Sequence, residues 1–236
     1  MSHADIPVGA GDLAAGLPAT ARLSLVTAAL ADGVSTLRGV TLDETVCSIL
    51  QALSVLGMRT RVDESLLKIE IAGCAGHWPE GECDLECANR AVLGILASAC
   101  CTGWGRYRLI DVPGGALAPD PGMLAALRDL GVSVSHDEAA GRLPLDIRAS
   151  GLTGAIVKVT SPGAGQWLGG FLVASACSRS DVFIEIDTPA FSLDAVRPAL
   201  RLMEVFGVPV VGPDHGKIVI PAPQVYRAAE IDFSMA

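Results

Sequence analysis

Three stretches of the chain place hydroxyl, amide and guanidinium groups directly before or at the start of an apolar segment. These groups are carried by Thr20 and Arg22, by Asn89 and Arg90, and by Ser161 and Gln166. A helix N-terminus adds free N–H groups and a positive dipole end, which suit an anionic or polyhydroxylated molecule. We therefore predict that these six residues bind a small polar or carboxylated substrate.

Each of these residues also has a purely structural explanation. Thr20, Asn89 and Ser161 are suitable N-caps, and Arg22 and Arg90 can be solvated residues of a first helical turn. A positive charge at that position opposes the helix dipole, however, and is mildly unfavourable without an anion. Ligand binding and capping alone both remain open.

Two carboxylates near these stretches are candidate catalytic residues. Glu86 or Asp120 can act as a proton carrier if burial raises the pKa of its carboxyl group. The alternative is that each is an ordinary solvated loop carboxylate without a role in catalysis. His77, Cys83 and Cys87 lie close together, but no CxxC pair or second pair of ligands accompanies them. We predict no metal and no other cofactor.

The apolar segments must be helices that other parts of the chain surround. Residues 21–30, 91–100 and 166–175 are alanine-rich or apolar and almost uncharged, and a helix without a polar face must be buried on all sides. Three amphipathic helices, at 45–56, 122–130 and 193–206, are expected more peripherally, the last with Ser192 as its N-cap and Pro198 bending or shortening its start. Each ends in a Leu-Gly or Phe-Gly step, with a period of about 75 residues.

Strands follow the helices, and many of them alternate apolar with polar residues, as in a sheet with one wet face. The predicted strands are 35–40, 59–62, 67–72, 107–112, 132–136, 145–149, 155–160, 182–187, 208–211 and 217–221. These patterns predict an α/β (α+β) fold with helices in the middle and sheets outside. It forms one domain, 1–236, of three repeated units at about 18–75, 84–150 and 154–222.

Composition narrows the possible partners. The chain has 236 residues, of which 50% are hydrophobic and 18% are charged, with a net charge of −9. This charge argues against a nucleic-acid partner, and no apolar run reaches the length of a membrane span. Residues 1–18 resemble neither a secretory signal nor a transit peptide, and the seven cysteines are an odd number, several of them in apolar helical stretches. We expect a cytoplasmic protein that needs no disulfides.

Several segments resemble one family, the enolpyruvyl transferases, which includes 5-enolpyruvylshikimate-3-phosphate (EPSP) synthase. The segments are 28–33 (AALADG), 42–45 (LDET), 52–57 (ALSVLG), 166–168 (QWL) and 202–208 (LMEVFGV). The resemblance implies two inside-out, barrel-like α/β domains, each of three repeated units, with the substrate between them. This chain resembles the first domain, and residues 223–236 resemble the crossover to a second one, in which the family's acidic acid/base residues reside.

The chain departs from the family at most of the liganding positions that the resemblance implies. The chain has Pro18-Ala19 where the family has a Lys-Ser pair, and Ala164-Gly165 where the family has a serine pair. Three arginines of the family are replaced by Leu23, Leu93 and Asp120, and a tyrosine is replaced by Phe191. Gln166 is retained. Each lost charge-assisted hydrogen bond is worth about 1.5 to 3 kcal/mol. Phosphoenolpyruvate chemistry by this chain alone is therefore not expected.

Three functional hypotheses remain from the sequence. The first is a repurposed biosynthetic enzyme, or an enzyme half, that binds a small molecule at the helix N-termini. The second is a non-catalytic pseudoenzyme or subunit that docks a second-domain-like protein or a homodimer partner. The third is one half of a split 3-phosphoshikimate 1-carboxyvinyltransferase, which the lost arginines disfavour.

Overall fold

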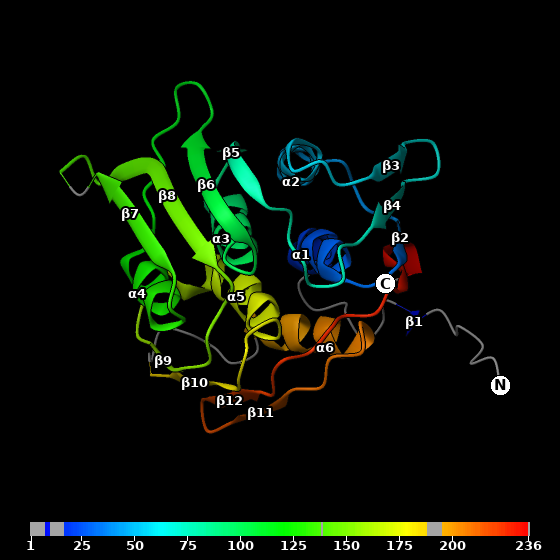
Figure 1. Cartoon of the computed structure of the whole chain (residues 1–236). Helices are drawn as coiled ribbons and strands as arrows, with labels where there is room; N and C mark the ends of the chain where they lie inside the picture. Colours follow the sequence, from blue (N-terminus) through cyan, green and yellow to red (C-terminus); the bar gives the residue numbers. More distant parts are fainter. Residues whose placement is uncertain (1–7, 10–16, 138, 188–194, 236) are drawn as a thin grey trace.

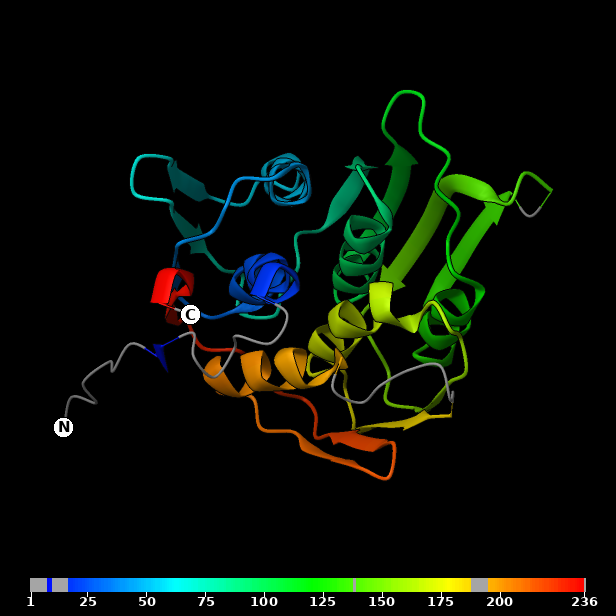
Figure 2. The ribbon, with the colours of Figure 1, turned by 180° about the vertical axis from the view of Figure 1, so that it is seen from behind.

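The computed structural model describes residues 8–9, 17–137, 139–187 and 195–235, and in this part the helices lie in the middle with three sheets around them (Figure 1). The same arrangement is visible from behind in Figure 2. The helices are α1 (Leu17–Leu30), α2 (Glu44–Val55), α3 (Arg90–Cys100), α4 (Pro121–Asp129), α5 (Leu168–Ser175) and α6 (Arg197–Val205), with short 3-10 turns η2 (Ala164–Gln166) and η4 (Phe233–Met235). The predicted α/β fold with its helices inside is confirmed.

The three sheets share one pairing scheme. In the second sheet β5 (Gly81–Cys87) pairs parallel with β6 (Trp104–Asp111), followed by antiparallel β8 (Arg142–Ser150) and β7 (Ser133–Asp137). The third sheet repeats this order with β9 (Ile156–Val159), β10 (Val182–Ile186), β12 (Lys217–Ile220) and β11 (Val211–Asp214). The first sheet contains β2 (Val34–Arg38), β4 (Lys68–Ala72) and β3 (Thr60–Asp63), with β13 (Glu230–Asp232) parallel to β2 and β1 (Val8–Gly9) at its edge.

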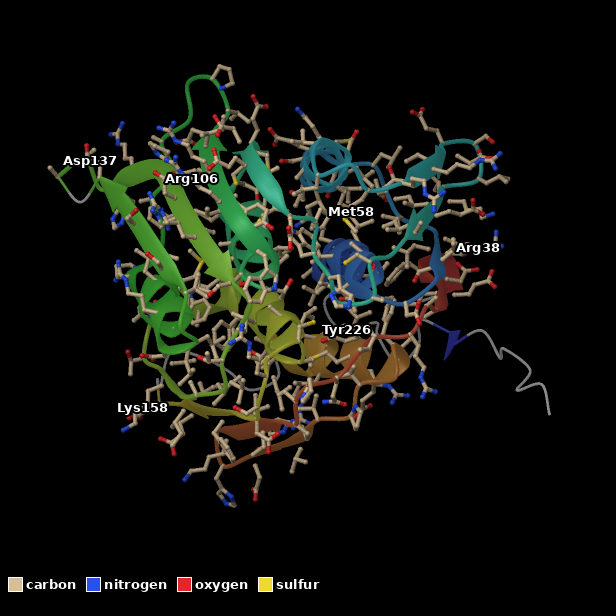
Figure 3. The ribbon with its side chains drawn as sticks, in the orientation of Figure 1. Arg38, Met58, Arg106, Asp137, Lys158 and Tyr226 are labelled. Carbon is tan, nitrogen blue, oxygen red and sulfur yellow. The ribbon has the colours of Figure 1, made fainter. Side chains whose placement is uncertain are left out.

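Strand β13 comes from the segment that resembles a crossover. It occupies the place in the first sheet that β5 and β9 occupy in the others. Tyr226 and Ile231 of this segment are buried, and Figure 3 shows Tyr226 in the interior of the molecule. Residues 223–235 are therefore part of the packed body.

The central helices approach each other closely because glycines lie at their crossing. A Cβ atom on Gly94 of α3 would lie 2.6 Å from the carbonyl oxygen of Gln166, and one on Gly170 of α5 would lie 2.9 Å from the Cα atom of Ile95. Real Cβ contacts are not this short, so neither position accepts a side chain without a shift. The two glycines thus bring the N-terminal part of α5 against α3.

Several element boundaries differ from those expected. Helix α1 begins at Leu17, so Thr20 lies inside the first turn and is not an N-cap. Helix α6 begins at Arg197 with Pro198 in its first turn, consistent with a proline that shortens the helix start; the expected cap Ser192 is outside the described residues, as is Phe191. Strand β11 begins at Val211, three residues later than predicted.

Strand β5 was not predicted. Its acidic residues Glu82, Asp84 and Glu86 are exposed, while Leu85 and Cys87 between and after them are buried. This alternation is typical of a strand with one solvated face. The many charged residues in this segment made the alternation difficult to recognise in the sequence. Among the described helices, none is long and apolar enough to cross a membrane.

Candidate functional site

A pocket of about 480 Å³, which we call the central pocket, lies where the first turns of α1 meet α3, η2 and the starts of α5 and α6. Thr20, Arg22 and Gln166 line it together with small apolar residues such as Ala91 and Ala195. The structure therefore brings together three of the residues predicted to bind substrate. They come from helices that are far apart in sequence.

A second pocket of about 190 Å³, the Arg90 pocket, lies beside the central pocket. Arg90, Asp120, Gln166 and Trp167 line it, so Gln166 belongs to both pockets. Arg90 is the first residue of α3 and is exposed. Its side chain forms no hydrogen bond or ion pair with any other residue that the structure describes.

Arg22 has an anionic partner within the chain. Its Nη2 atom lies 2.5 Å from Oδ2 of Asp43, the N-cap of α2, whose Oδ1 accepts a hydrogen bond from the backbone N–H of Val46. Burial alone would raise the pKa of Asp43, but the hydrogen bonds and charge of Arg22 and the Val46 N–H hold this pKa below its ordinary value. The anion needed beside Arg22 is therefore Asp43.

Asn89 is the N-cap of α3. Its Oδ1 atom accepts hydrogen bonds of 3.1 Å from the backbone N–H groups of Ala91 and Val92, and its Nδ2 atom donates to Oγ1 of Thr45 at 2.8 Å. Both ends of the amide are thus engaged within the protein. Two of the N–H groups at the start of α3 are satisfied by this cap.

Asp120 and Ser161 form a compact polar cluster. Oδ1 of Asp120 accepts from the backbone N–H groups of Gly122 and Met123, which makes Asp120 the N-cap of α4. Its Oδ2 accepts from the Ser161 hydroxyl at 2.8 Å, and that hydroxyl accepts from the N–H of Gly163 at 3.1 Å. Asp120 lines the Arg90 pocket, whereas Ser161 lines neither pocket and supports the loop from behind Asp120.

Glu86 does not join the other candidates. It is exposed on β5, between the inward-facing Leu85 and Cys87, and it lines neither pocket. A carboxylate on the exposed face of this sheet, outside both pockets, is not placed to exchange a proton with a ligand bound in them.

Two functional-site features could not be expected from the sequence reasoning above. The indole Nε1 of Trp167 is buried and has no hydrogen-bond partner, although the ring lines the Arg90 pocket and is only 2% exposed. Asp43 carries an N-cap signal, because an aspartate precedes an amphipathic run there, but its pairing with Arg22 depends on the packing of α1 against α2. The unpaired guanidinium of Arg90, with the amide of Gln166, favours a ligand that presents acceptor oxygens.

Three of the cysteines are unsuited to nucleophilic chemistry at neutral pH. Burial raises the pKa of Cys74 to about 11 and those of Cys87 and Cys177 to about 12, so these thiols stay protonated. Within the described ranges no three His, Cys, Asp or Glu side chains are arranged to hold a metal ion. A broader hollow of about 570 Å³, lined by Trp104, Arg106 and Arg148 among others, lies on the outer face of the second sheet, apart from the helix N-termini.

Comparison with known proteins identifies relatives over most of the chain. A family model described as EPSP synthase (3-phosphoshikimate 1-carboxyvinyltransferase) matches residues 15–233. The 3-phosphoshikimate 1-carboxyvinyltransferase of Vibrio atlanticus (strain LGP32) is 29% identical over 87% of this chain and 49% of the relative. The enzyme of that name from Vibrio cholerae serotype O1 (strain M66-2) is 32% identical over 86% of this chain and 48% of the relative.

Solved structures show the same fold. EPSP synthase from Acinetobacter baumannii superposes with a TM-score of 0.76 at 17% identity, covering 90% of this chain and 47% of that one. The enolpyruvyl transferase NikO from Streptomyces tendae superposes with a TM-score of 0.63 at 14% identity, covering 91% and 49%. The chain spans about half the length of the curated relatives it matches, 49% in the case of Vibrio atlanticus.

Proposed function

The chain belongs to the EPSP synthase family, and on that premise we propose that it binds a small polar or carboxylated metabolite where the N-terminal parts of α1, α3 and α5 meet. Arg90 and Gln166 are the principal ligand-binding residues of this proposal. The Arg90 pocket takes the anionic group, and the central pocket takes the remainder of the molecule.

The proposal depends on two side chains that line the same pocket: the guanidinium of Arg90, which has no partner in the described part of the chain, and the amide of Gln166, which belongs to both pockets. Arg90 is free of partners among the described residues, and Gln166 lies between the two pockets. An unpaired guanidinium and an amide that line the same pocket suit an acceptor group on a ligand.

The carboxyvinyl transfer that names the family's enzymes receives less support in this chain. The charge of Arg22 is neutralised by Asp43, and Asp120 already accepts three hydrogen bonds as a cap. Glu86 lines neither pocket. We therefore assign no proton-transfer role to these residues, and the proposal is binding of a metabolite less anionic than the pair of phosphorylated substrates that the family resemblance implies.

A second function is favoured by the lining of the central pocket. Most of its residues are small and apolar, including Ala19, Ala91, Ala195 and Ala199. Such a surface suits contact with another protein domain as well as with a small molecule. On this alternative the chain is a non-catalytic subunit or pseudoenzyme whose helix ends dock a second-domain-like protein.

Ligand titrations distinguish these possibilities. Thermal-shift and calorimetric titrations would use shikimate 3-phosphate, phosphoenolpyruvate, inorganic phosphate, shikimate and uncharged cyclitols. A carboxylated or polar compound that binds the wild-type protein should bind Arg90→Ala and Gln166→Ala about 10- to 100-fold more weakly, because each loses a hydrogen bond to the ligand. Arg61→Ala, which removes an exposed arginine from β3, is the matched control and should bind normally.

The possible outcomes separate the hypotheses. Unchanged affinity in both pocket variants removes the site assignment. Binding only of shikimate 3-phosphate and phosphoenolpyruvate would favour the reaction of the family, and a complete absence of binding would favour the docking function.

A further inference from the structure

The outer face of the third sheet carries an apolar row that crosses all four strands. Ile156 on β9, Phe183 on β10, Val219 on β12 and Val211 on β11 are direct cross-strand partners in that order. Ile156, Phe183 and Val211 are 66%, 44% and 61% exposed, although their sequence neighbours Val157, Val182 and Ile184 are buried. Single exposed apolar residues are ordinary, but an aligned row on a wet face indicates a contact surface.

A row of alternating charge lies beside the apolar row on the same face of the sheet. On β9, β10 and β12 each charged residue is two positions away from the apolar residue of that strand. In the same strand order the charged row consists of Lys158, Glu185, Lys217 and Asp214, and the register aligns each with its neighbour. Nζ of Lys217 lies 3.4 Å from Oε1 of Glu185. Figure 3 shows Lys158 at the outside of the molecule, away from the helices. The sign of the charge therefore reads plus, minus, plus, minus across the sheet.

This pattern is complementary to itself under one symmetry operation. A two-fold axis that runs along the strands, between β10 and β12, reverses the strand order and stacks two copies of the sheet face to face. The apolar row of one copy then covers the apolar row of the other. Lys158 of each copy faces Asp214 of the other, and Glu185 faces Lys217, so opposite signs meet at every position.

We infer that the chain forms a two-fold symmetric homodimer through the outer face of its third sheet. Self-complementary patches are the property that a two-fold interface requires, because each copy presents the same residues to the other. Sheets stack face to face at a separation of about 10 Å with nearly aligned strands. The apolar row stabilises the contact, and the charges select its orientation.

The interface is small, which sets the strength expected of it. Stable complexes bury about 800 Å² per partner, and a four-stranded face of short strands offers less. The dimer should therefore form reversibly, with a dissociation constant in the micromolar range or weaker. Sedimentation velocity from a few micromolar to about one millimolar should show the average mass rising from monomer towards dimer.

Charge reversals at the two edge strands test the orientation. Lys158 and Asp214 lie on opposite edges of the sheet, separated by β10 and β12, so they cannot pair within one chain. Lys158→Glu and Asp214→Lys should each place like charges opposite each other and weaken self-association by about tenfold or more. The double variant should restore it. A mixture of the two single variants should form a heterodimer more strongly than either forms a homodimer.

Circular dichroism and thermal unfolding verify that all variants remain folded. We expect this because the substituted residues lie on the surface. Phe183→Lys, in the centre of the apolar row, should abolish association in both the wild-type and the double-reversal background. A wild-type chain that remains monomeric up to about one millimolar overturns the inference. So does a dimer that single reversals leave unchanged, or one that the double reversal does not restore.

Discussion

The Nη2 atom of Arg22, on α1, donates to Oδ2 of Asp43, the N-cap of α2, over 2.5 Å. The other carboxylate oxygen of Asp43 accepts from the backbone N–H of Val46 at 2.8 Å. One aspartate thus caps a helix and neutralises an arginine at the edge of the central pocket. The sequence suggested that Arg22 needs an anion at this position, and the fold supplies one from within the chain.

Replacing Asp43 should separate its two roles by their effect on stability. Asp43→Ala removes both the cap and the ion pair, and we expect it to lower the free energy of unfolding by about 1 to 2 kcal/mol. Asp43→Asn keeps an N-cap side chain but no charge, so its cost should be smaller, below about 1 kcal/mol. Urea unfolding measures both values. Equal losses in the two variants would show that the cap contributes nothing.

The same residue should make stability depend on pH in the acid range. Partial burial opposes the shift, but Arg22 and the Val46 N–H hold the pKa of Asp43 below its ordinary value of 3.8. A group with a lowered pKa in the folded state stabilises the protein above the unfolded-state pKa and loses this effect as the pH falls through the folded-state pKa. The stability difference between wild type and Asp43→Asn should therefore be constant from about pH 7 to 5 and shrink below about pH 4. A difference that instead grows towards low pH would contradict this assignment.

The central helices were predictable because their composition leaves no alternative to burial. The stretch from Val92 to Cys100 is buried throughout, as its lack of charge requires. The amphipathic partners and most strands follow from their periodicity in the same way. Strand β13 escaped prediction because it depends on contacts between distant segments: it pairs with β2 across nearly the whole chain, and only three residues form it.

The candidate site was less predictable than the fold. Proximity in sequence to the helix starts singled out Thr20, Arg22 and Gln166, which line one pocket. It did not distinguish donors that remain free, such as Arg90, from Asn89, which the fold uses as a cap. That distinction depends on partners such as Thr45, which are brought close only by tertiary packing.

The crossing of α3 and α5 gives a prediction with an internal control. Gly94→Ala would place a Cβ atom 2.7 Å from the Cα atom of Trp167, so the helices must move apart. We expect a loss of about 1 to 3 kcal/mol in the free energy of unfolding, as in overpacked cores. Gly169 is on α5, and the Cβ atom that Gly169→Ala adds would lie 3.4 Å from its nearest neighbour, a methyl group of Leu23, which is an ordinary contact. It should be neutral or stabilising by up to about 1 kcal/mol, because alanine favours the helix. Similar effects of the two changes would argue against a tight crossing at Gly94.

The hydroxyl of Tyr226 fastens the C-terminal segment to the helical core. It donates a hydrogen bond of 2.8 Å to the carbonyl oxygen of Val173, in the last turn of α5, where helix carbonyls lack partners within the helix. Tyr226→Phe keeps the ring but leaves this buried carbonyl without its donor, which should cost about 1 to 2 kcal/mol and lower the Tm by about 2 to 8 °C. Tyr107→Phe removes a comparable bond, from the hydroxyl of the buried Tyr107 to the carbonyl of Pro79, a residue that is only partly buried. Water can replace that bond more easily, so the control should lose less stability.

Calorimetric unfolding of the two variants, each compared with wild type, tests whether the hydrogen bond of Tyr226 stabilises the packing of this segment against the helical core. If Tyr226→Phe unfolds at the wild-type temperature, burial of the ring alone holds residues 223–235 in place.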